Sequence, residues 1–210
     1  MIKVLIADDH TVVRQGLKQI LSEDPQLSVV GEAADGNEVL AALETLSVDA
    51  LVLDITMPGR NGLDVLKEVK RKRPALPVLV LSMHPEDQFA IRILRAGAAG
   101  YITKESAPEE LVGALRKVCS GGKYVSPQLA ERLAVFIEDK TTRPPHEKLS
   151  DREFEVLRML ALGKTVTEVA EELLLSVKTV STYRSRVLEK MKMTSNADLT
   201  RYALQNELMT

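Results

Sequence analysis

The feature that most constrains the fold of this chain is an alternation of short β-branched apolar runs with helical patterns over the first 120 of its 210 residues. The runs lie at about 2–8, 28–33, 49–54, 77–82 and 99–103, and the helical patterns at about 10–22, 36–46, 62–72, 86–96 and 107–119. Such alternation is typical of a parallel sheet joined by crossover helices. Because crossovers are right-handed and helices cover both faces, we predict a doubly wound (βα)₅ domain of the α/β class.

Polar residues stand where the apolar runs of this predicted sheet end. Asp8 and Asp9 close the first run, Asp54 closes the third, and Ser82 and Lys104 close the last two. Ligands of open α/β sheets bind outside the carboxyl ends of the strands, so these five residues are expected at one edge. Taken singly, the Asp pair also fits an acidic loop, Ser82 a strand cap and Lys104 a surface charge. Their joint occurrence at strand ends favours a site.

The residue types at this edge suit phosphoryl chemistry. Clustered carboxylates such as Asp8, Asp9 and Asp54 can hold Mg²⁺, which prefers oxygen ligands and keeps several waters. Asp54 could then attack phosphorus to give an acyl phosphate, with Lys104 balancing its charge and Ser82 donating a hydroxyl. His10 follows the acidic pair, but a helix-opening role is favoured there because Mg²⁺ prefers oxygen.

The second part of the chain is helical and lacks any strand pattern. Residues 121–148 form a predicted linker with a short helical pattern at 128–137 and a Pro-containing polar stretch. From Leu149 onward we predict four short helices, the first capped by Ser150 or Asp151 and ending near Gly163. The domains are thus expected at 1–120 and 149–210, joined by the linker 121–148.

The second and third of these helices are joined by residues 174–176, which is short enough for a helix-turn-helix. The third helix begins at Ser176, and residues 176–192 contain five basic residues and one acidic residue, a net charge of +4. Small hydroxyls and bases on its outer face could enter the major groove of DNA. A merely solvated face is the alternative. The predicted DNA contacts are Lys178, Thr179, Ser181, Thr182, Ser185, Arg186 and Lys190.

Composition excludes several other classes of function. The chain has 3% aromatic residues and no Trp, which argues against a base-stacking surface for single strands. Its single cysteine, Cys119, excludes an intrachain disulfide and a Cys-rich metal site. No apolar stretch approaches the ~20 residues that span a bilayer, so we expect a cytoplasmic protein without membrane contacts.

The first 120 residues resemble a response-regulator receiver domain. The matching segments are Val4–His10, Asp54–Gly59 through Gly62, Leu81–Ser82 and Arg95–Lys104. By this resemblance Asp54 is the phosphoacceptor for a sensor histidine kinase, and Mg²⁺ is bound by Asp8, Asp9, Asp54 and the backbone carbonyl of Thr56.

The resemblance also implies that Ser82 and Lys104 sense the phosphoryl group and that Tyr101 moves with Ser82. Packing alone is the alternative for Tyr101. One departure from the family pattern is Glu105, which follows Lys104 where many receivers have Pro.

The C-terminal part resembles a LuxR-type helix-turn-helix. The match is carried by Leu149–Glu153, Val156-Leu157, Gly163 and Ser176–Tyr183, although family members often have His in place of Tyr183. Both parts together resemble the NarL/FixJ class of response regulators. This resemblance implies a two-component transcription regulator that is phosphorylated, binds double-stranded promoter DNA and forms a homodimer when active. It further implies no enzyme activity beyond the receiver's part in its own phosphoryl transfer and autodephosphorylation.

Three rival interpretations fit the sequence less well. A haloacid-dehalogenase-like phosphatase wants a second Asp two residues after Asp54, where Thr56 stands. A P-loop ending at Gly163-Lys164-Thr165 requires Gly where Arg158 stands, and no strand precedes it. A receiver that binds a partner without phosphate is disfavoured by the complete set of acidic, hydroxyl and lysine residues.

Overall fold

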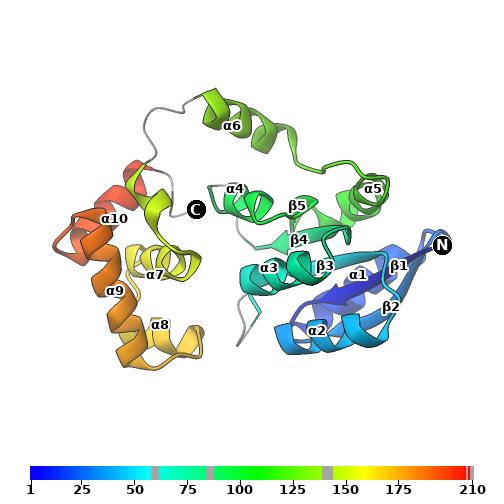
Figure 1. The fold of residues 1–210 in the computed structure, drawn as a ribbon, viewed down its shortest axis with the longest axis horizontal. Helices are drawn as coiled ribbons and strands as arrows, with labels where there is room; N and C mark the ends of the chain where they lie inside the picture. The colour runs from blue at the N-terminus through cyan, green and yellow to red at the C-terminus, as the bar shows by residue number, and fades with distance from the viewer. Residues whose placement is uncertain (58–61, 84–87, 139–143, 207, 209–210) are drawn as a thin grey trace. The chain divides into compact units, whose positions relative to one another are not determined.

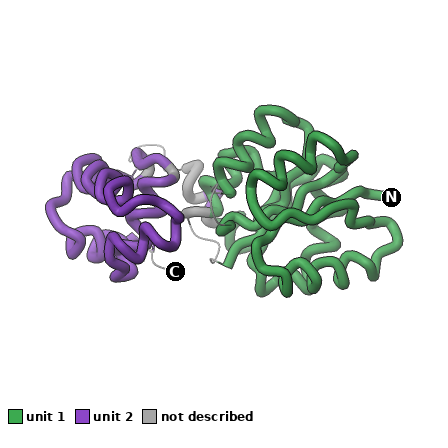
Figure 2. Tube along the Cα trace, turned by 90° about the horizontal axis from the view of Figure 1, so that it is seen from below, with its two compact units in different colours: residues 1–132 green, residues 133–210 purple. Residues whose placement is uncertain are grey.

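The computed structural model describes residues 1–57, 62–83, 88–138, 144–206 and 208 (Figure 1). The chain divides into two compact units, residues 1–132 and residues 133–210 (Figure 2). Each unit is described by itself. The predicted segments at 58–61, 86–87, 139–143 and 207 lie outside the described residues.

The first unit is built on a five-stranded parallel sheet with the strand order β2-β1-β3-β4-β5. The strands are β1 (Ile2–Ala7), β2 (Leu27–Ala33), β3 (Ala50–Asp54), β4 (Val78–Ser82) and β5 (Gly100–Thr103). All five lie where the sequence predicts them. The step from β1 outward to β2 and back to β3 reverses the direction of the sheet, so the carboxyl ends of β1 and β3 flank a switch point. The predicted doubly wound fold is therefore confirmed.

Helices cover both faces of this sheet. They are α1 (Thr11–Ser22), α2 (Gly36–Thr45), α3 (Gly62–Lys72), α4 (Gln88–Arg95) and α5 (Ala107–Cys119), followed by α6 (Pro127–Glu138). α1 and α5 pack side by side, and Leu17, Leu21, Leu111 and Leu115 from them join one core with Ile6 of β1. His10 takes the N-cap position of α1 in an extended conformation, which confirms its helix-opening place.

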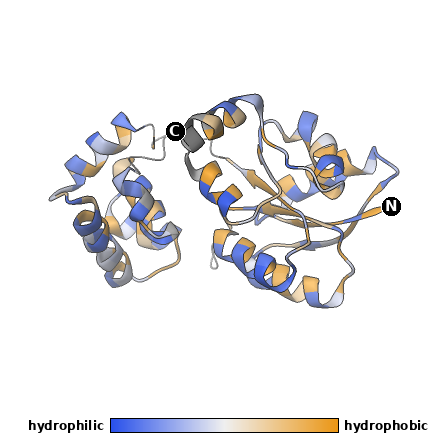
Figure 3. Ribbon diagram, turned by 45° about the horizontal axis from the view of Figure 1, so that its top comes forward, coloured by the Kyte–Doolittle hydropathy of each residue, from blue (hydrophilic) through white to orange (hydrophobic). Residues whose placement is uncertain are grey.

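The burial of the central strands explains their sequence. Every residue of β3 and β4 is buried, because helices cover both faces, and such strands read as nearly continuous apolar runs. The inner side of the helices is likewise apolar and their outer side polar (Figure 3). Asp54 and Ser82 are the exceptions, since both are polar and have no exposed surface. Burial of such polar groups is costly unless they are hydrogen-bonded or paired.

The segment after α5 lies along the outer edge of β5. Tyr124 forms a parallel bridge with Gly100, and its backbone exchanges hydrogen bonds with Tyr101 (3.1 Å) and Ala99 (3.0 Å). The Lys123 ammonium also donates to the Ala98 carbonyl at 2.6 Å. The start of the predicted linker thus pairs with the receiver sheet, and this contact protects its edge.

The second unit is entirely helical in the described residues. It comprises a 3₁₀ turn, η1 (Pro145–Lys148), and the helices α7 (Asp151–Ala161), α8 (Val166–Glu172), α9 (Val177–Met191) and α10 (Asn196–Gln205). Four helices follow Leu149, as predicted: α7 begins directly after Ser150 and ends two residues before Gly163, and α9 begins directly after Ser176. Across the described residues of both units, no helix is long and apolar enough to cross a bilayer.

Side-chain caps fix the helix starts of the second unit. Ser150, Thr165 and Ser195 each accept a hydrogen bond from the backbone amide of the third helical residue, and the carboxylate of that residue accepts one from the cap backbone amide. Ser176 caps α9 by accepting a hydrogen bond from the Thr179 amide, without this reciprocal bond because Thr179 has no carboxylate. Between α8 and α9 the chain turns at Leu174, which has φ +52°, and the Leu175 amide bonds back to Ala170 at 2.8 Å. α8 and α9 are therefore joined by a tight helical turn.

Candidate functional site

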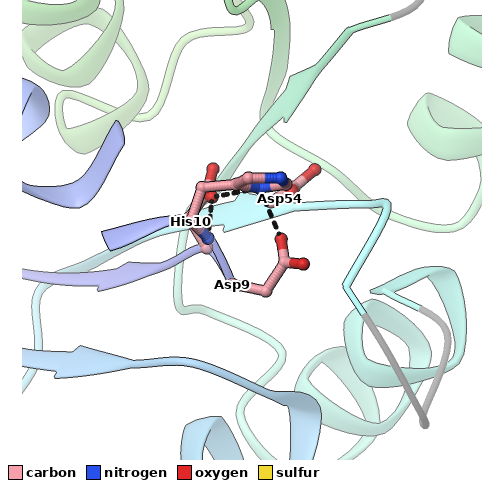
Figure 4. A group of neighbouring side chains, drawn as sticks. Asp9, His10 and Asp54 are labelled. Atoms are coloured by element: carbon pink, nitrogen blue, oxygen red, sulfur yellow. Dashed lines mark hydrogen bonds and ion pairs between the residues drawn. The ribbon is translucent and has the colours of Figure 1, made fainter. Parts of the chain in front are cut away.

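Three carboxylates meet at the carboxyl ends of β1 and β3. Asp8 and Asp54 have no exposed surface, and the Asp9 side chain is 27% exposed. One ligand atom from each of these residues and from His10 lies within 4.8 Å of all the others. Figure 4 shows Asp9 and His10 beside Asp54 at the end of β3. The predicted convergence of these aspartates at one edge of the sheet is what the structure shows.

Lys104 neutralises part of this charge. Its ammonium lies 2.6 Å from Asp8 Oδ2 and 2.8 Å from Asp54 Oδ2, and its side chain is only 8% exposed. Burial by itself lowers the pKa of Lys104, but the hydrogen bonds and charges of Asp54 and Asp8 outweigh burial, so the net shift is upward. Lys104 therefore remains a cation and holds Asp8 and Asp54 together.

The second oxygen of Asp54 is held by the residue two positions later. Asp54 Oδ1 accepts hydrogen bonds from the Thr56 amide (2.9 Å) and from the Thr56 hydroxyl (3.1 Å). With Lys104 on the other oxygen, the orientation of the carboxylate is fixed at both ends. A fixed and partly neutralised carboxylate is preorganised to act as a nucleophile.

The donor set fits a divalent cation. Three carboxylates and one ammonium leave a formal charge of −2, and all three acidic side chains offer oxygen. Asp8 Oδ2 and Asp9 Oδ1 are buried and accept no well-aligned hydrogen bond from the described residues, although Lys104 and His10 lie at ion-pair distance from them. Their lone pairs are thus only partly satisfied. Oxygens in this condition suit Mg²⁺, and the His10 imidazole adds a nitrogen at the rim.

Ser82 and Tyr101 lie on the neighbouring strands. Ser82 is buried at the end of β4, and its carbonyl accepts the Lys104 amide at 2.8 Å. Tyr101 is fully buried in β5, where it pairs with Val80. The packing interpretation of Tyr101 agrees with this burial, while its predicted switching role stays a prediction. The peptide bond between Lys104 and Glu105 is trans, as are all others among the described residues.

In the second unit, α9 presents a hydroxyl-rich outer face. Val180, Val187 and Met191 are buried against the bundle. The outer residues Lys178, Ser181, Thr182, Ser185 and Arg186 are exposed, and Thr179 is half-buried. The Thr182 and Ser185 hydroxyls bond back to the carbonyls four residues earlier, at 2.9 and 3.0 Å. Such hydroxyls can reorient toward a ligand without leaving a buried group unpaired.

Two basic residues of α9 have partners inside the unit. The Lys190 ammonium lies 2.6 Å from Glu153 Oε2 on α7, and Arg184 Nε donates to Asn196 Oδ1 at 2.7 Å. The sequence predicts Lys190 as a DNA contact, and that prediction takes no account of Glu153. The position of Lys190 on its own helix could not show this partner, because 37 residues separate Lys190 from Glu153 along the chain.

The contact between His146 and the last helix was not predicted from the sequence either. His146 in η1 is buried, and its Nδ1 lies 2.7 Å from the Tyr202 hydroxyl on α10. Its ring also packs near Phe154, at a centroid distance of 5.9 Å. No spacing rule relates a residue of the predicted linker to the last helix, so no sequence signal could have found this contact.

Family models match both units. The response regulator receiver domain matches residues 4–116, and the luxR family of bacterial regulatory proteins matches residues 147–203. The first match contains the whole acidic cluster and Lys104. The second contains α7 to α9 and most of α10.

Curated relatives match nearly the whole chain. The response regulator UvrY of Escherichia coli strain K12 is 37% identical over 209 residues, which are 99% of this chain and 96% of UvrY. The response regulator GacA of Pseudomonas aeruginosa is 39% identical over 210 residues, which are 100% of this chain and 98% of GacA.

Solved structures give the same result. An RcsB response regulator from Salmonella typhimurium matches with a TM-score of 0.72 and 31% identity, over 100% of this chain and 98% of that one. RcsB from Salmonella enterica serovar Typhimurium, bound to promoter rprA in the presence of phosphomimetic BeF₃⁻, matches with a TM-score of 0.69 and 31% identity, over 96% of this chain and 97% of that one. This chain therefore belongs to the NarL/FixJ family of response regulators and is a phosphorylation-dependent transcription regulator, with a receiver domain and a LuxR-type helix-turn-helix.

Proposed function

We propose that Asp54 accepts a phosphoryl group from a sensor histidine kinase. The observation that carries this proposal is the buried Asp54 carboxylate, held by Lys104 at 2.8 Å and by Thr56 at 2.9 Å beside two further carboxylates. Mg²⁺ would be held by Asp8, Asp9, Asp54 and the Thr56 backbone carbonyl. When bound, it supplies positive charge that offsets the repulsion between phosphoryl and carboxylate oxygens.

The residues of the chain then have distinct roles in the transfer. A carboxylate oxygen of Asp54 forms the new bond to phosphorus while the bond to the donor imidazole breaks and its electron pair stays on that nitrogen. The Lys104 ammonium leaves the Asp54 oxygen for a phosphoryl oxygen, and the Ser82 hydroxyl donates to another. We propose that Tyr101 responds to the movement of Ser82. Hydrolysis of the acyl phosphate by water at the same site would end the signal, so the chain needs no further enzyme activity.

The output of this switch is proposed to be binding of double-stranded promoter DNA by α9. Ser181, Thr182 and Ser185 lie on the exposed face of the helix and can reach base edges in the major groove. Lys178 and Arg186 flank that face and can contact phosphates. Thr179 lies in the first turn, where its hydroxyl is 2.7 Å from that of the cap residue Ser176.

We further propose that the active form is a homodimer on a two-fold DNA site. Solved structures of the relative RcsB include two dimers bound to two parallel DNAs, which supports this proposal. A phosphoryl group that binds one of two pre-existing states more favourably shifts their populations, and about 1.4 kcal/mol of preference changes the ratio tenfold.

The phosphoryl part is tested by incubating the full chain with Mg²⁺ and a small phosphodonor, and by measuring its intact mass. We expect a gain of one phosphoryl group in the wild type, none in Asp54→Ala, and none in the wild type when EDTA removes the metal. Asp64→Asn is the matched control, because Asp64 is an exposed aspartate on α3 outside the cluster. A mass gain in Asp54→Ala equal to that of the wild type would refute the assignment.

A further inference from the structure

The five basic residues of the Ser176–Lys192 segment are not equivalent in the structure. Lys178 and Arg186 are exposed, and their charged groups have no hydrogen-bonding or ionic partner among the residues that the structure describes. The Lys190 side chain is also 40% exposed, but its ammonium lies 2.6 Å from Glu153 Oε2 on α7. Helical periodicity alone does not distinguish these cations. The structure does, because Lys190 has an ionic partner within the unit.

The Glu153 carboxylate that receives Lys190 is almost fully buried, with 3% of its surface exposed. The same oxygen, Oε2, accepts the Ser150 amide at 2.7 Å as part of the capping box that begins α7. Burial alone raises the pKa of Glu153, but the hydrogen bonds from Lys190 and Ser150 outweigh it and lower the pKa. Glu153 is therefore a buried anion, and Lys190 is the cation that compensates it.

This arrangement makes Lys190 a poor phosphate ligand. A buried carboxylate that loses its cation is strongly destabilised, so a Lys190 side chain that swung outward to DNA would leave Glu153 uncompensated. Lys178 and Arg186 carry no such penalty, because they are solvated in the free protein. Exchanging Glu153 for a DNA phosphate as the partner of Lys190 is therefore unfavourable, so we expect Lys190 to stay paired with Glu153 both with and without DNA.

The contact also links two elements that must be aligned for DNA recognition. Glu153 lies in the first turn of α7 and Lys190 in the last turn of α9. Midway along α9, Arg184 bonds to Asn196 at the start of α10, at 2.7 Å. These polar contacts are directional, so they supplement the apolar packing of α9 in fixing its rotation and its position along its axis.

We infer that Lys190 is a positioning residue for DNA binding, which fixes the C-terminal end of α9 on α7 through Glu153 and does not contact phosphate. This inference rests on the proposed DNA-contacting face of α9. In this inference Lys190 and Glu153 position the DNA-contacting face of α9 for sequence recognition. Lys178 and Arg186 supply the positive charges that contact DNA phosphates.

Salt dependence distinguishes the two roles, because each lost phosphate contact changes the slope of log K against log [salt] by about 0.9. We would measure binding of the full chain to a duplex selected by the wild type from a random library, and to an unselected duplex. The variants are Lys190→Met, Lys190→Arg, Glu153→Gln and the double variant Lys190→Met/Glu153→Gln, with Lys178→Met as the matched control. Glu153→Gln keeps the capping acceptor and removes only the charge, so the fold is retained.

For Lys190→Met and Glu153→Gln we expect the wild-type slope, and a preference for the selected duplex that falls roughly tenfold. Their effects should not add in the double variant, and Lys190→Arg should restore the preference. A slope reduced by about 0.9 in Lys190→Met, or an unchanged preference in Glu153→Gln, would overturn the inference. The proposed DNA-contacting face fails on a different result, an unchanged slope in Lys178→Met.

Discussion

At the scale of single residues, both units contain buried carboxylates that are compensated by lysines. Asp8 and Asp54 share Lys104 in the receiver unit, and Glu153 takes Lys190 in the helical unit. Each buried carboxylate is tolerated because a lysine compensates it. In the receiver the compensation is incomplete and leaves a formal charge of −2 for a divalent cation. At Glu153 one lysine meets one carboxylate, so that site is structural and needs no ligand.

These pairs also show what the sequence can predict at this scale. Asp8, Asp54, Ser82 and Lys104 were predicted together because each ends an apolar strand run, and parallel strands bring their carboxyl ends to one edge. The Lys190–Glu153 pair was not predicted. Helix periodicity gives the direction of a side chain from its own axis but not the neighbour toward which that direction points. The position of Lys104 at a strand end predicted its neighbours, whereas the position of Lys190 on a helix did not predict Glu153.

The Glu153 pair predicts a pH dependence of stability. Because the folded pKa of Glu153 lies below its ordinary value of 4.5, its ionised form stabilises the fold above that pH, and this stability is lost as the pH falls below it. At pH 7 we expect Glu153→Gln to unfold with about 1 kcal/mol less free energy than the wild type, a value discounted because Lys190 is partly exposed. The difference should shrink progressively as the pH falls below 4.5. Scanning calorimetry of both proteins across this range measures it, and a difference that is constant with pH would contradict the assignment.

At the scale of secondary-structure elements, periodicity predicted nearly every helix and strand, since the elements are long and their apolar faces regular. The edge pairing of Tyr124 with β5 was not predicted and falls in the expected linker. A single bridging residue has no alternation that could mark it as a strand. Gly100 is the position that makes the approach possible, because a Cβ there would lie 2.8 Å from the Tyr124 carbonyl oxygen.

Two glycine substitutions in the receiver are expected to change its stability in opposite directions. Gly100→Ala should displace Tyr124 or strain β5 and lower the free energy of unfolding by about 1–3 kcal/mol, as overpacking does. Gly113→Ala is the matched control, because Gly113 lies within α5 and has no atom within 4 Å of its Cβ position. There we expect a gain of about 0.5–1 kcal/mol from helix propensity. Calorimetric melting of the receiver tests both, and equal stability of Gly100→Ala and the wild type would show that the Tyr124 contact is not tight.

At the scale of the whole molecule, the chain joins a receiver domain to a LuxR-type helix-turn-helix domain. In the proposed function the receiver changes charge at Asp54, whereas the helical unit holds α9 in place through caps, apolar packing and the Glu153 pair. Sequence reasoning could predict both parts, because each has its own periodicity and its own polar signature. On the proposed function, phosphorylation acts by shifting the population of a binding-competent state.

The most direct test of this account is the affinity of the full chain for its selected duplex, measured with Mg²⁺ and with or without a phosphodonor. We predict that the phosphodonor tightens binding by the wild type about tenfold or more. Asp54→Ala should bind equally under both conditions, and Asp64→Asn should behave like the wild type. An equal gain in affinity for Asp54→Ala, or no gain for a wild type shown by mass to be phosphorylated, would contradict the claim that Asp54 controls DNA binding.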